Sequence, residues 1–180
     1  MAAKMTNEIF SVVNGLNSDE DRVIYLRQNA TKAVKELLRY NFNDDIKFLL
    51  PEGRPELKES EKDDFNPQRG FFEGVDDGAT LNYEMRKMYL FIEGGHPALT
   101  SLKRESLWHE LINSLHPSEA DDLWHMKDKK LQVKYKKITH LVAYNSFPEG
   151  LQQPQPESKR DNQGRFIKTE KPKKKQKVKK

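Results

Sequence analysis

The chain has 180 residues, of which 35% are apolar and 33% charged, and it contains no cysteine. That length suits one ordinary domain. The lack of cysteine excludes disulfides, thiolate metal ligands and cysteine nucleophiles, and no apolar run approaches the roughly 18–20 residues of a membrane span. We therefore expect a soluble intracellular protein. The net charge of +4 is uneven, because residues 51–80 hold four basic and nine acidic side chains, whereas residues 152–180 hold eleven basic and three acidic ones.

The first fifty residues have the apolar spacing of four short helices. We expect Thr6 to cap the first helix, and Ser18, which precedes three acidic residues, to begin the second, since carboxylates favour the positive end of a helix dipole. A fourth helix should begin at Asn43 or Asp44 and end at Pro51. The apolar stripes are Ile9, Val13 and Leu16; Val23, Ile24 and Leu26; Ala30, Ala33, Val34, Leu37 and Leu38; and Ile46, Phe48, Leu49 and Leu50.

Residues 51–80 interrupt the helical pattern with prolines, glycines and acidic side chains. Connections of this length inside a small domain are more often mobile or functional than tightly packed, so we predict a mobile acidic loop. Helical spacing returns from Leu81 to Ile92, again on either side of His116-Pro117, and near residues 138–147. No run of alternating β-branched residues predicts a sheet.

The sequence Leu-Trp-His occurs twice, ending at His109 and at His125. At 100° per residue, both histidines point roughly 130–140° away from their apolar stripes, so we expect the histidines outside and Trp108 and Trp124 inside. Asp122 and His125 have the Asp-x-x-His spacing, which is similar to half of a di-iron carboxylate unit. We predict no metal site, cofactor or catalytic group here, because the second unit is missing and this pair is expected on the outward face.

Two lysine-rich segments are candidate nucleic-acid contacts. In the first, near residues 126–137, a lysine-rich helix end that complements its own dipole is as good an explanation as a contact with phosphates. The second ends the chain and needs no packing explanation, although a purely solubilising tail is the alternative. The candidate residues are Lys127, Lys129, Lys130, Lys134, Lys136 and Lys137 in the first segment, and Lys171, Lys173, Lys174, Lys175, Lys177, Lys179 and Lys180 in the second.

Four segments in order resemble an uncharacterised protein family of T4-like tailed bacteriophages and cyanophages. They are DDIKFLLPEG (44–53), RKMYLFIEGGHPAL (86–99), KRESLWHELINSLHPSEADDLWHMKDKKL (103–131) and ITHLVAYNSFPEGL (138–151). The two tryptophans stand where the family pattern has phenylalanine or aliphatic residues. The resemblance implies a phage protein in the cytoplasm of the infected bacterial host, with the virion as the other location. It implies no catalytic residue.

We therefore predict an all-α protein: a compact bundle of about six to eight short helices over residues 1–150, interrupted by the irregular loop 51–80, with a disordered lysine-rich tail at 151–180. The expected function is that of a non-enzymatic phage accessory protein, which binds an unidentified phage or host protein and, through its tail, DNA or RNA without sequence preference. One alternative is a virion or assembly protein that contacts packaged DNA. Another is an enzyme that uses Asp122 and His125.

Overall fold

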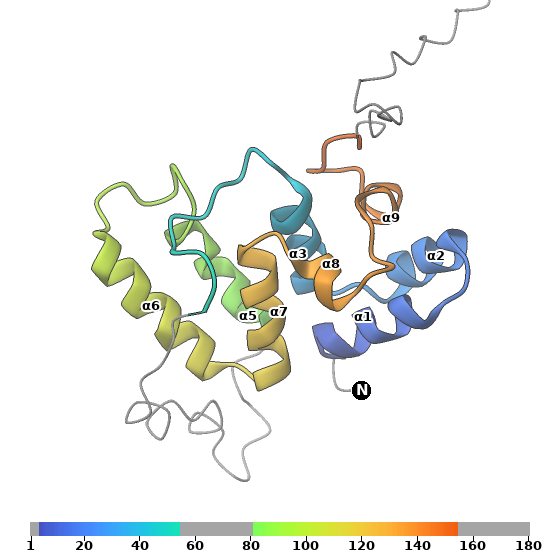
Figure 1. Ribbon diagram of the computed structural model, residues 1–180, viewed down its shortest axis with the longest axis horizontal. Coiled ribbons are helices and arrows are strands. Elements are labelled where there is room, and N and C mark those ends of the chain that lie inside the picture. The colour runs from blue at the N-terminus through green and yellow to red at the C-terminus, as the bar shows by residue number, and fades with distance from the viewer. Residues whose placement is uncertain (1–3, 55–80, 155–180) are drawn as a thin grey trace, which may run out of the picture.

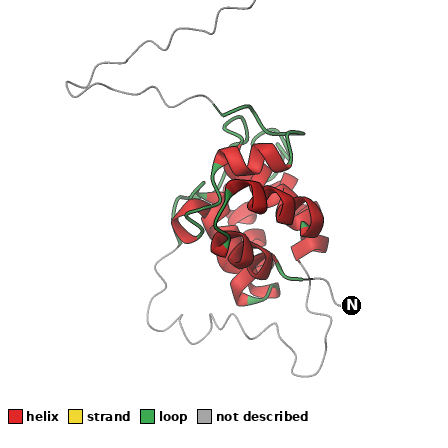
Figure 2. Cartoon of the chain, turned by 90° about the vertical axis from the view of Figure 1, so that its right-hand side faces the viewer, coloured by secondary structure: helices red, strands yellow, loops and turns green. Residues whose placement is uncertain are grey.

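The computed structural model describes residues 4–54 and 81–154, and within these residues helices joined by loops are the regular secondary structure, apart from one isolated β-bridge (Figures 1 and 2). The all-α prediction is confirmed. Most of the predicted mobile loop (residues 55–80) and of the predicted disordered tail (residues 155–180) lies outside the described residues. No helix in the part that the structure describes is long and apolar enough to cross a bilayer.

The helices are short, and most begin where the sequence offers a capping side chain. Ser18 accepts a hydrogen bond from the backbone N–H of Asp21 at 3.0 Å, and Thr31, Thr100 and Thr139 act in the same way at later helices. The elements are α1 (Thr6–Gly15), α2 (Asp19–Asn29), α3 (Lys32–Phe42), α5 (Leu81–Glu84), the 3₁₀ helix η1 (Met85–Leu90), α6 (Ser101–Ser114), α7 (Pro117–Lys127), α8 (Leu131–Lys134) and α9 (His140–Ser146).

Helices α3 and α7 pack together at the centre, between two groups of helices (Figure 1). On one side α2 packs against α1 and α9, which in turn pack against α7 and α3, and on the other side lie α5 and α6. The core is continuous across both groups, and within it the fully buried Trp108 contacts Phe91 and Trp124 edge to face. Each large aromatic ring buries much apolar area, and edge-to-face pairs add about 0.5–1.5 kcal/mol to that burial.

The predicted helix from Asn43 or Asp44 to Leu50 is wrong. Asn43 is the C-cap of α3, Asp44 and Asp45 form a turn, and Phe48 forms an antiparallel bridge with Ile92. The backbone N–H of Leu49 donates to the carbonyl of Phe91 at 2.8 Å, and the N–H of Glu93 donates to the carbonyl of Lys47 at 2.9 Å. A run of four to eight apolar residues cannot be assigned to helix or strand by periodicity alone, and here a distant segment decides it.

Both predicted boundaries of the helical body also change. Residues 51–54, expected in the mobile loop, lie against α7, where the Gly53 N–H donates to the Asp128 carboxylate at 3.0 Å. At the other end Leu151 is buried in the core, and the Gln152 carbonyl accepts a hydrogen bond from the ring of His140 at 2.9 Å. Residues 151 and 152, which we expected in the tail, therefore contact the helical body.

Candidate functional site around helix α7

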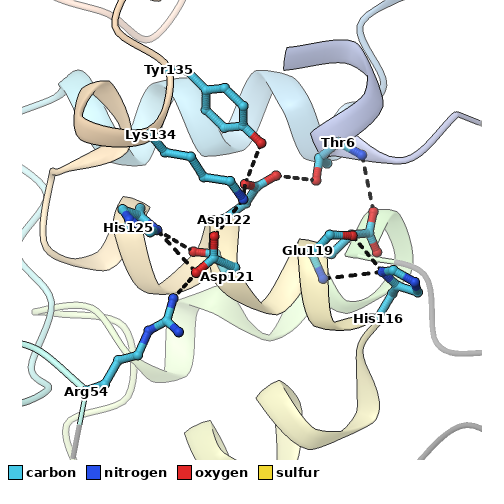
Figure 3. Close-up of polar contacts among 10 residues, drawn as sticks. Thr6, Arg54, His116, Glu119, Asp121, Asp122, His125, Lys134 and Tyr135 are labelled. Carbon is cyan, nitrogen blue, oxygen red and sulfur yellow. Dashed lines mark hydrogen bonds and ion pairs between the residues drawn. The ribbon is translucent and has the colours of Figure 1, made fainter. Parts of the chain in front are cut away.

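Helix α7 gathers the polar side chains that the sequence singles out. Its start follows from the sequence, since Pro117 occupies the first turn and the ring of His116 accepts a hydrogen bond from the Ser118 N–H. Because α1, α3, α6 and α8 all pack against it, α7 buries polar residues as well as apolar ones. Figure 3 shows how these polar residues contact the neighbouring helices.

Asp122 lies on a buried face of α7, not on the outward face that we predicted for it. Its side chain is 0% exposed, and one carboxylate oxygen accepts a hydrogen bond from the Thr6 hydroxyl at 2.9 Å. The other oxygen accepts from the Tyr135 hydroxyl at 2.9 Å and from the Lys134 ammonium at 2.6 Å (Figure 3). The cationic partner and the two hydroxyl donors make this burial tolerable, because an unpaired buried carboxylate would be very costly. Burial and the adjacent carboxylate raise the pKa of the Tyr135 hydroxyl, which stays protonated and donating.

Glu119 connects the first turns of two other helices. One carboxylate oxygen accepts from the Thr6 N–H of α1 at 3.4 Å, and the other accepts from the Leu81 N–H of α5 at 3.2 Å. Thr6, which we expected as the cap of α1, is instead its first residue; the cap position is Met5, whose side chain makes no capping hydrogen bond. A carboxylate at a helix N-terminus is favourable, and here it comes from a distant helix. Burial raises the pKa of Glu119, although the two backbone hydrogen bonds oppose the shift.

His125 contacts Asp121, not Asp122. Its Nδ1 lies 2.8 Å from the Asp121 carbonyl oxygen, which can only accept, so Nδ1 carries the hydrogen in this geometry. The Asp121 carboxylate is 3.6 Å from the same nitrogen and also pairs with Arg54 and Lys134. Burial, followed by the charges of Arg54 and Lys134, lowers the pKa of His125 below its ordinary value. The ring is therefore mainly neutral at pH 7, with Nε2 as its acceptor.

This arrangement does not bring Asp122 and His125 together. Their side chains leave α7 in different directions: Asp122 points toward Thr6 and Tyr135, and His125 lies beside Asp121 (Figure 3). Nowhere in residues 4–54 and 81–154 do three or more potential ligands gather in a group that could hold a metal ion. The contacts around α7 can fix helices to one another, and they show no converging acid, base and nucleophile among the described side chains.

The two Leu-Trp-His segments meet at a small pocket of about 100 Å³. Both tryptophans are buried as predicted, and their rings cross at 79° with centroids 5.7 Å apart. His109 and His125, predicted to face outward, are partly buried, and the His109 ring lies 6.2 Å from that of Trp124. Residues 50–53, Glu105, Trp108, His109 and Trp124 line the pocket.

The profile of the family of unknown function DUF6433 matches residues 9–133, which is well over half of the chain. The chain belongs to this family. No curated protein and no solved structure matches the sequence. The DUF6433 match contains all of α7 and the tryptophan pocket, but it ends one residue before Lys134 and Tyr135 and does not reach the C-terminal tail.

The lysines that lead from α7 to α9 in this DUF6433 protein do not form one open basic face. Most of their ammonium groups bind acceptors of the same chain, and Lys127 is fully enclosed. The contacts are Lys127 with the Pro51 carbonyl and the Asp128 carboxylate, Lys129 with the Asn43 carbonyl, Lys130 with the Glu52 carboxylate, Lys134 with Asp121 and Asp122, and Lys137 with the Leu16 carbonyl. Lys136 is exposed. The seven candidate lysines from Lys171 onward lie outside the described residues.

Sequence reasoning missed four residues of this network: Thr6, Arg54, Glu119 and Tyr135. From the sequence, Glu119 only indicated a favourable helix start, and Tyr135 was only an apolar residue between lysines. Their partners are 13 to 116 positions away in the sequence. No local pattern reports contacts over such separations, so a structure was needed to find them.

Proposed function

We propose that this DUF6433 protein is a non-enzymatic accessory protein of a tailed bacteriophage, which acts in the cytoplasm of the infected bacterium. It binds a phage or host protein through its helical surface and associates with DNA or RNA through its basic C-terminal tail. The observation that carries the nucleic-acid part is the separation of charge along the chain. Residues 155–180 hold eleven basic and three acidic side chains.

The helical body offers no comparable excess of positive charge. Residues 4–54 hold eight basic and eight acidic side chains, and residues 81–154 hold ten and nine. Most ammonium groups of the lysine cluster within 127–137 already bind carboxylates and carbonyls of the helical body. A polyanion would therefore meet its strongest attraction at the tail, and each lysine that neutralises a phosphate would release a condensed counterion.

The direct test compares the full chain with a chain that ends at Pro154. Ending there, and not at Gly150, keeps the buried Leu151 and the contacts of Gln152, so a loss of binding cannot come from a damaged core. We expect the full chain to bind a random duplex with a dissociation constant of about 10⁻⁴–10⁻⁶ M at physiological salt, and the shortened chain to lose most of this affinity and of its salt dependence.

A matched control keeps the length of the tail and removes only its charge. The seven lysines from Lys171 to Lys180 are changed to glutamine, which should weaken binding nearly as much as truncation does. Equal affinity and equal salt dependence of the full and shortened chains would refute the nucleic-acid part of the proposal, and the tail would be a solubilising segment.

The phage origin rests on the four resembling segments, and the site of action is tested separately. Mass spectrometry of infected cells and of purified virions tells a cytoplasmic accessory protein from a virion protein that contacts packaged DNA. The enzymatic alternative has less support, because Asp122 is enclosed by Thr6, Lys134 and Tyr135 and makes no hydrogen bond with His125.

A further inference from the structure

An aromatic and cationic stripe crosses the outer surface of α5 and η1. Tyr83 and Tyr89 are 57% and 49% exposed, and Arg86 between them is exposed as well. The 3₁₀ helix explains the alignment, because three residues per turn place positions 86 and 89 directly above one another. The inner face of the same segment carries the buried Met85 and Met88. We call Tyr83, Arg86 and Tyr89 the Tyr–Arg–Tyr stripe.

The stripe is fixed from below by its neighbours. The buried guanidinium of Arg104 donates to the Leu90 carbonyl at 3.0 Å and to the Leu99 carbonyl at 3.0 Å, which anchors the end of η1 to α6. Behind Tyr89, the chain turns at Gly94 and Gly95, and a Cβ on Gly95 would lie 1.8 Å from the Tyr89 carbonyl oxygen. The exposed rings therefore project from a backbone held in place, so binding would cost little additional ordering.

Folding does not account for the exposed groups of the stripe. The Arg86 guanidinium lies 3.5 Å from the centre of the Tyr83 ring, where the interaction is a cation–π contact. Within the part of the chain that the structure describes, no carboxylate forms an ion pair with Arg86, whereas its neighbour Lys87 is paired with Glu84. A guanidinium that has no carboxylate partner among the described residues and lies between two half-exposed rings is suited to a ligand that combines negative charge with flat aromatic groups.

We propose that the Tyr–Arg–Tyr stripe is a stacking platform for single-stranded nucleic acid, in which Tyr83 and Tyr89 stack on bases and Arg86 binds the intervening phosphate. Rises of 1.5 Å per residue in α5 and 2.0 Å in η1 separate the two tyrosines by about 11 Å, which spans a few nucleotides. Sequence-independent proteins of this class combine aromatic stacking with a cationic track. A duplex hides its base faces and cannot use the rings.

This inference does not require the tail to be functional. The tail would add affinity for any polyanion, whereas the stripe adds a preference for single strands. The two ideas are separable, because the tail is judged by the duplex affinity and salt dependence of the shortened chain. The stripe is judged by the ratio of single-strand to duplex affinity in the full chain.

The experiment measures fluorescence anisotropy of labelled oligo(dT) and oligo(U) of about 15 nucleotides, and of a duplex of equal length, with three variants of the full chain. Changing both tyrosines to leucine keeps apolar bulk and removes the rings, so single-strand affinity should fall at least about tenfold while duplex affinity changes less than twofold. Changing both to phenylalanine keeps the rings and should preserve binding. Arg86→Gln should reduce the single-strand salt slope by about 0.7.

The double change of Val133 and Leu141 to alanine, at two exposed apolar positions outside the stripe, controls for a general loss of surface apolar area. Thermal melts of every variant confirm folding. Leucine variants that bind oligo(dT) and oligo(U) like the unchanged protein would overturn the proposal. An equal loss in the phenylalanine variants would do the same, since it would show that the tyrosine hydroxyls, and not the stacked rings, make the contact.

Discussion

Replacement of Asp122 should be among the most damaging changes of a polar residue in this protein. The side chain is fully enclosed and accepts hydrogen bonds from three donors: the Thr6 hydroxyl of α1, the Lys134 ammonium of α8 and the hydroxyl of Tyr135, which follows α8. Asp122→Ala removes the acceptor of the Tyr135 hydroxyl, which has no other among the described residues, and it leaves the Thr6 hydroxyl buried without its Asp122 partner.

The expected cost is about 3–5 kcal/mol, the usual range when one member of a buried, hydrogen-bonded ion pair is removed. The neighbouring Asp121 supplies a matched control on the same helix with the same loss of charge. Its side chain is 30% exposed and its partners Arg54 and Lys134 are partly solvated, so Asp121→Ala should cost less than about 1 kcal/mol. Tyr135→Phe, which removes one of the three hydrogen bonds, should fall between them at about 1–2 kcal/mol.

Thermal and urea denaturation of the four proteins, followed by circular dichroism, provide the assay. For a chain of this size 1 kcal/mol corresponds to about 2–4 °C, so Asp122→Ala should melt roughly 10 °C lower and Asp121→Ala within about 4 °C of the unchanged protein. The double variant Asp122→Ala/Tyr135→Phe should be less destabilised than the sum of the single variants, because both remove the same hydrogen bond. Equal melting temperatures for the two aspartate variants would refute the reasoning.

Three further predictions concern packing, backbone geometry and pH. In urea denaturation, Trp108→Ala should lower the free energy of unfolding by about 3–5 kcal/mol and His109→Gln by less than about 0.5 kcal/mol. A larger loss for His109→Gln than for Trp108→Ala would contradict the assignment of Trp108, and not His109, to the core. Gly95→Ala should lower the melting temperature because its Cβ would meet a backbone carbonyl oxygen at 1.8 Å, whereas Gly15→Ala, which has open space, should leave it unchanged or raise it. The pKa of His125 is lower in the folded protein than in the unfolded chain, so the unfolded chain binds more protons near this pKa. The free energy of unfolding should therefore fall as the pH drops from above 6.5 through the folded pKa. Thermal melts at several pH values should show a weaker pH dependence for His125→Gln.

The sequence predicted the fold class and most helices because these depend on local patterns. The apolar periodicity, Ser18 and His116-Pro117 specify helix positions through neighbouring residues alone, and the structure has the corresponding caps and starts. The burial of Trp108 and Trp124 also follows from helical spacing. The extended segment at residues 46–50 could not be found in this way, because its hydrogen-bonding partners lie more than forty residues later.

Helical spacing placed Asp122 on the wrong side for a specific physical reason. The calculation assumes that a helix has one buried face, marked by apolar residues, and that polar residues face water. Helix α7 is covered by α6 on one side and by α1 and α8 on another, and the second contact surface is polar. A buried polar face and a solvated one have the same composition, so the sequence cannot tell them apart.

The polar contacts of α7 also bear on how the body folds as a whole. In helix α1 the side chain of the cap residue Met5 makes no capping hydrogen bond, although the Met5 N–H donates to the Glu8 carboxylate at 3.0 Å, and α5 is only four residues long, so both helices gain from contacts outside their own sequence. Glu119 supplies acceptors to the first turns of both helices, and Asp122 adds a contact with α1. These contacts join positions 38 to 116 residues apart, so the helices before and after residues 55–80 depend on each other. We therefore expect residues 4–54 and 81–154 to unfold as one cooperative unit, in which the surface of α5 and η1 keeps its geometry only while α7 is in place.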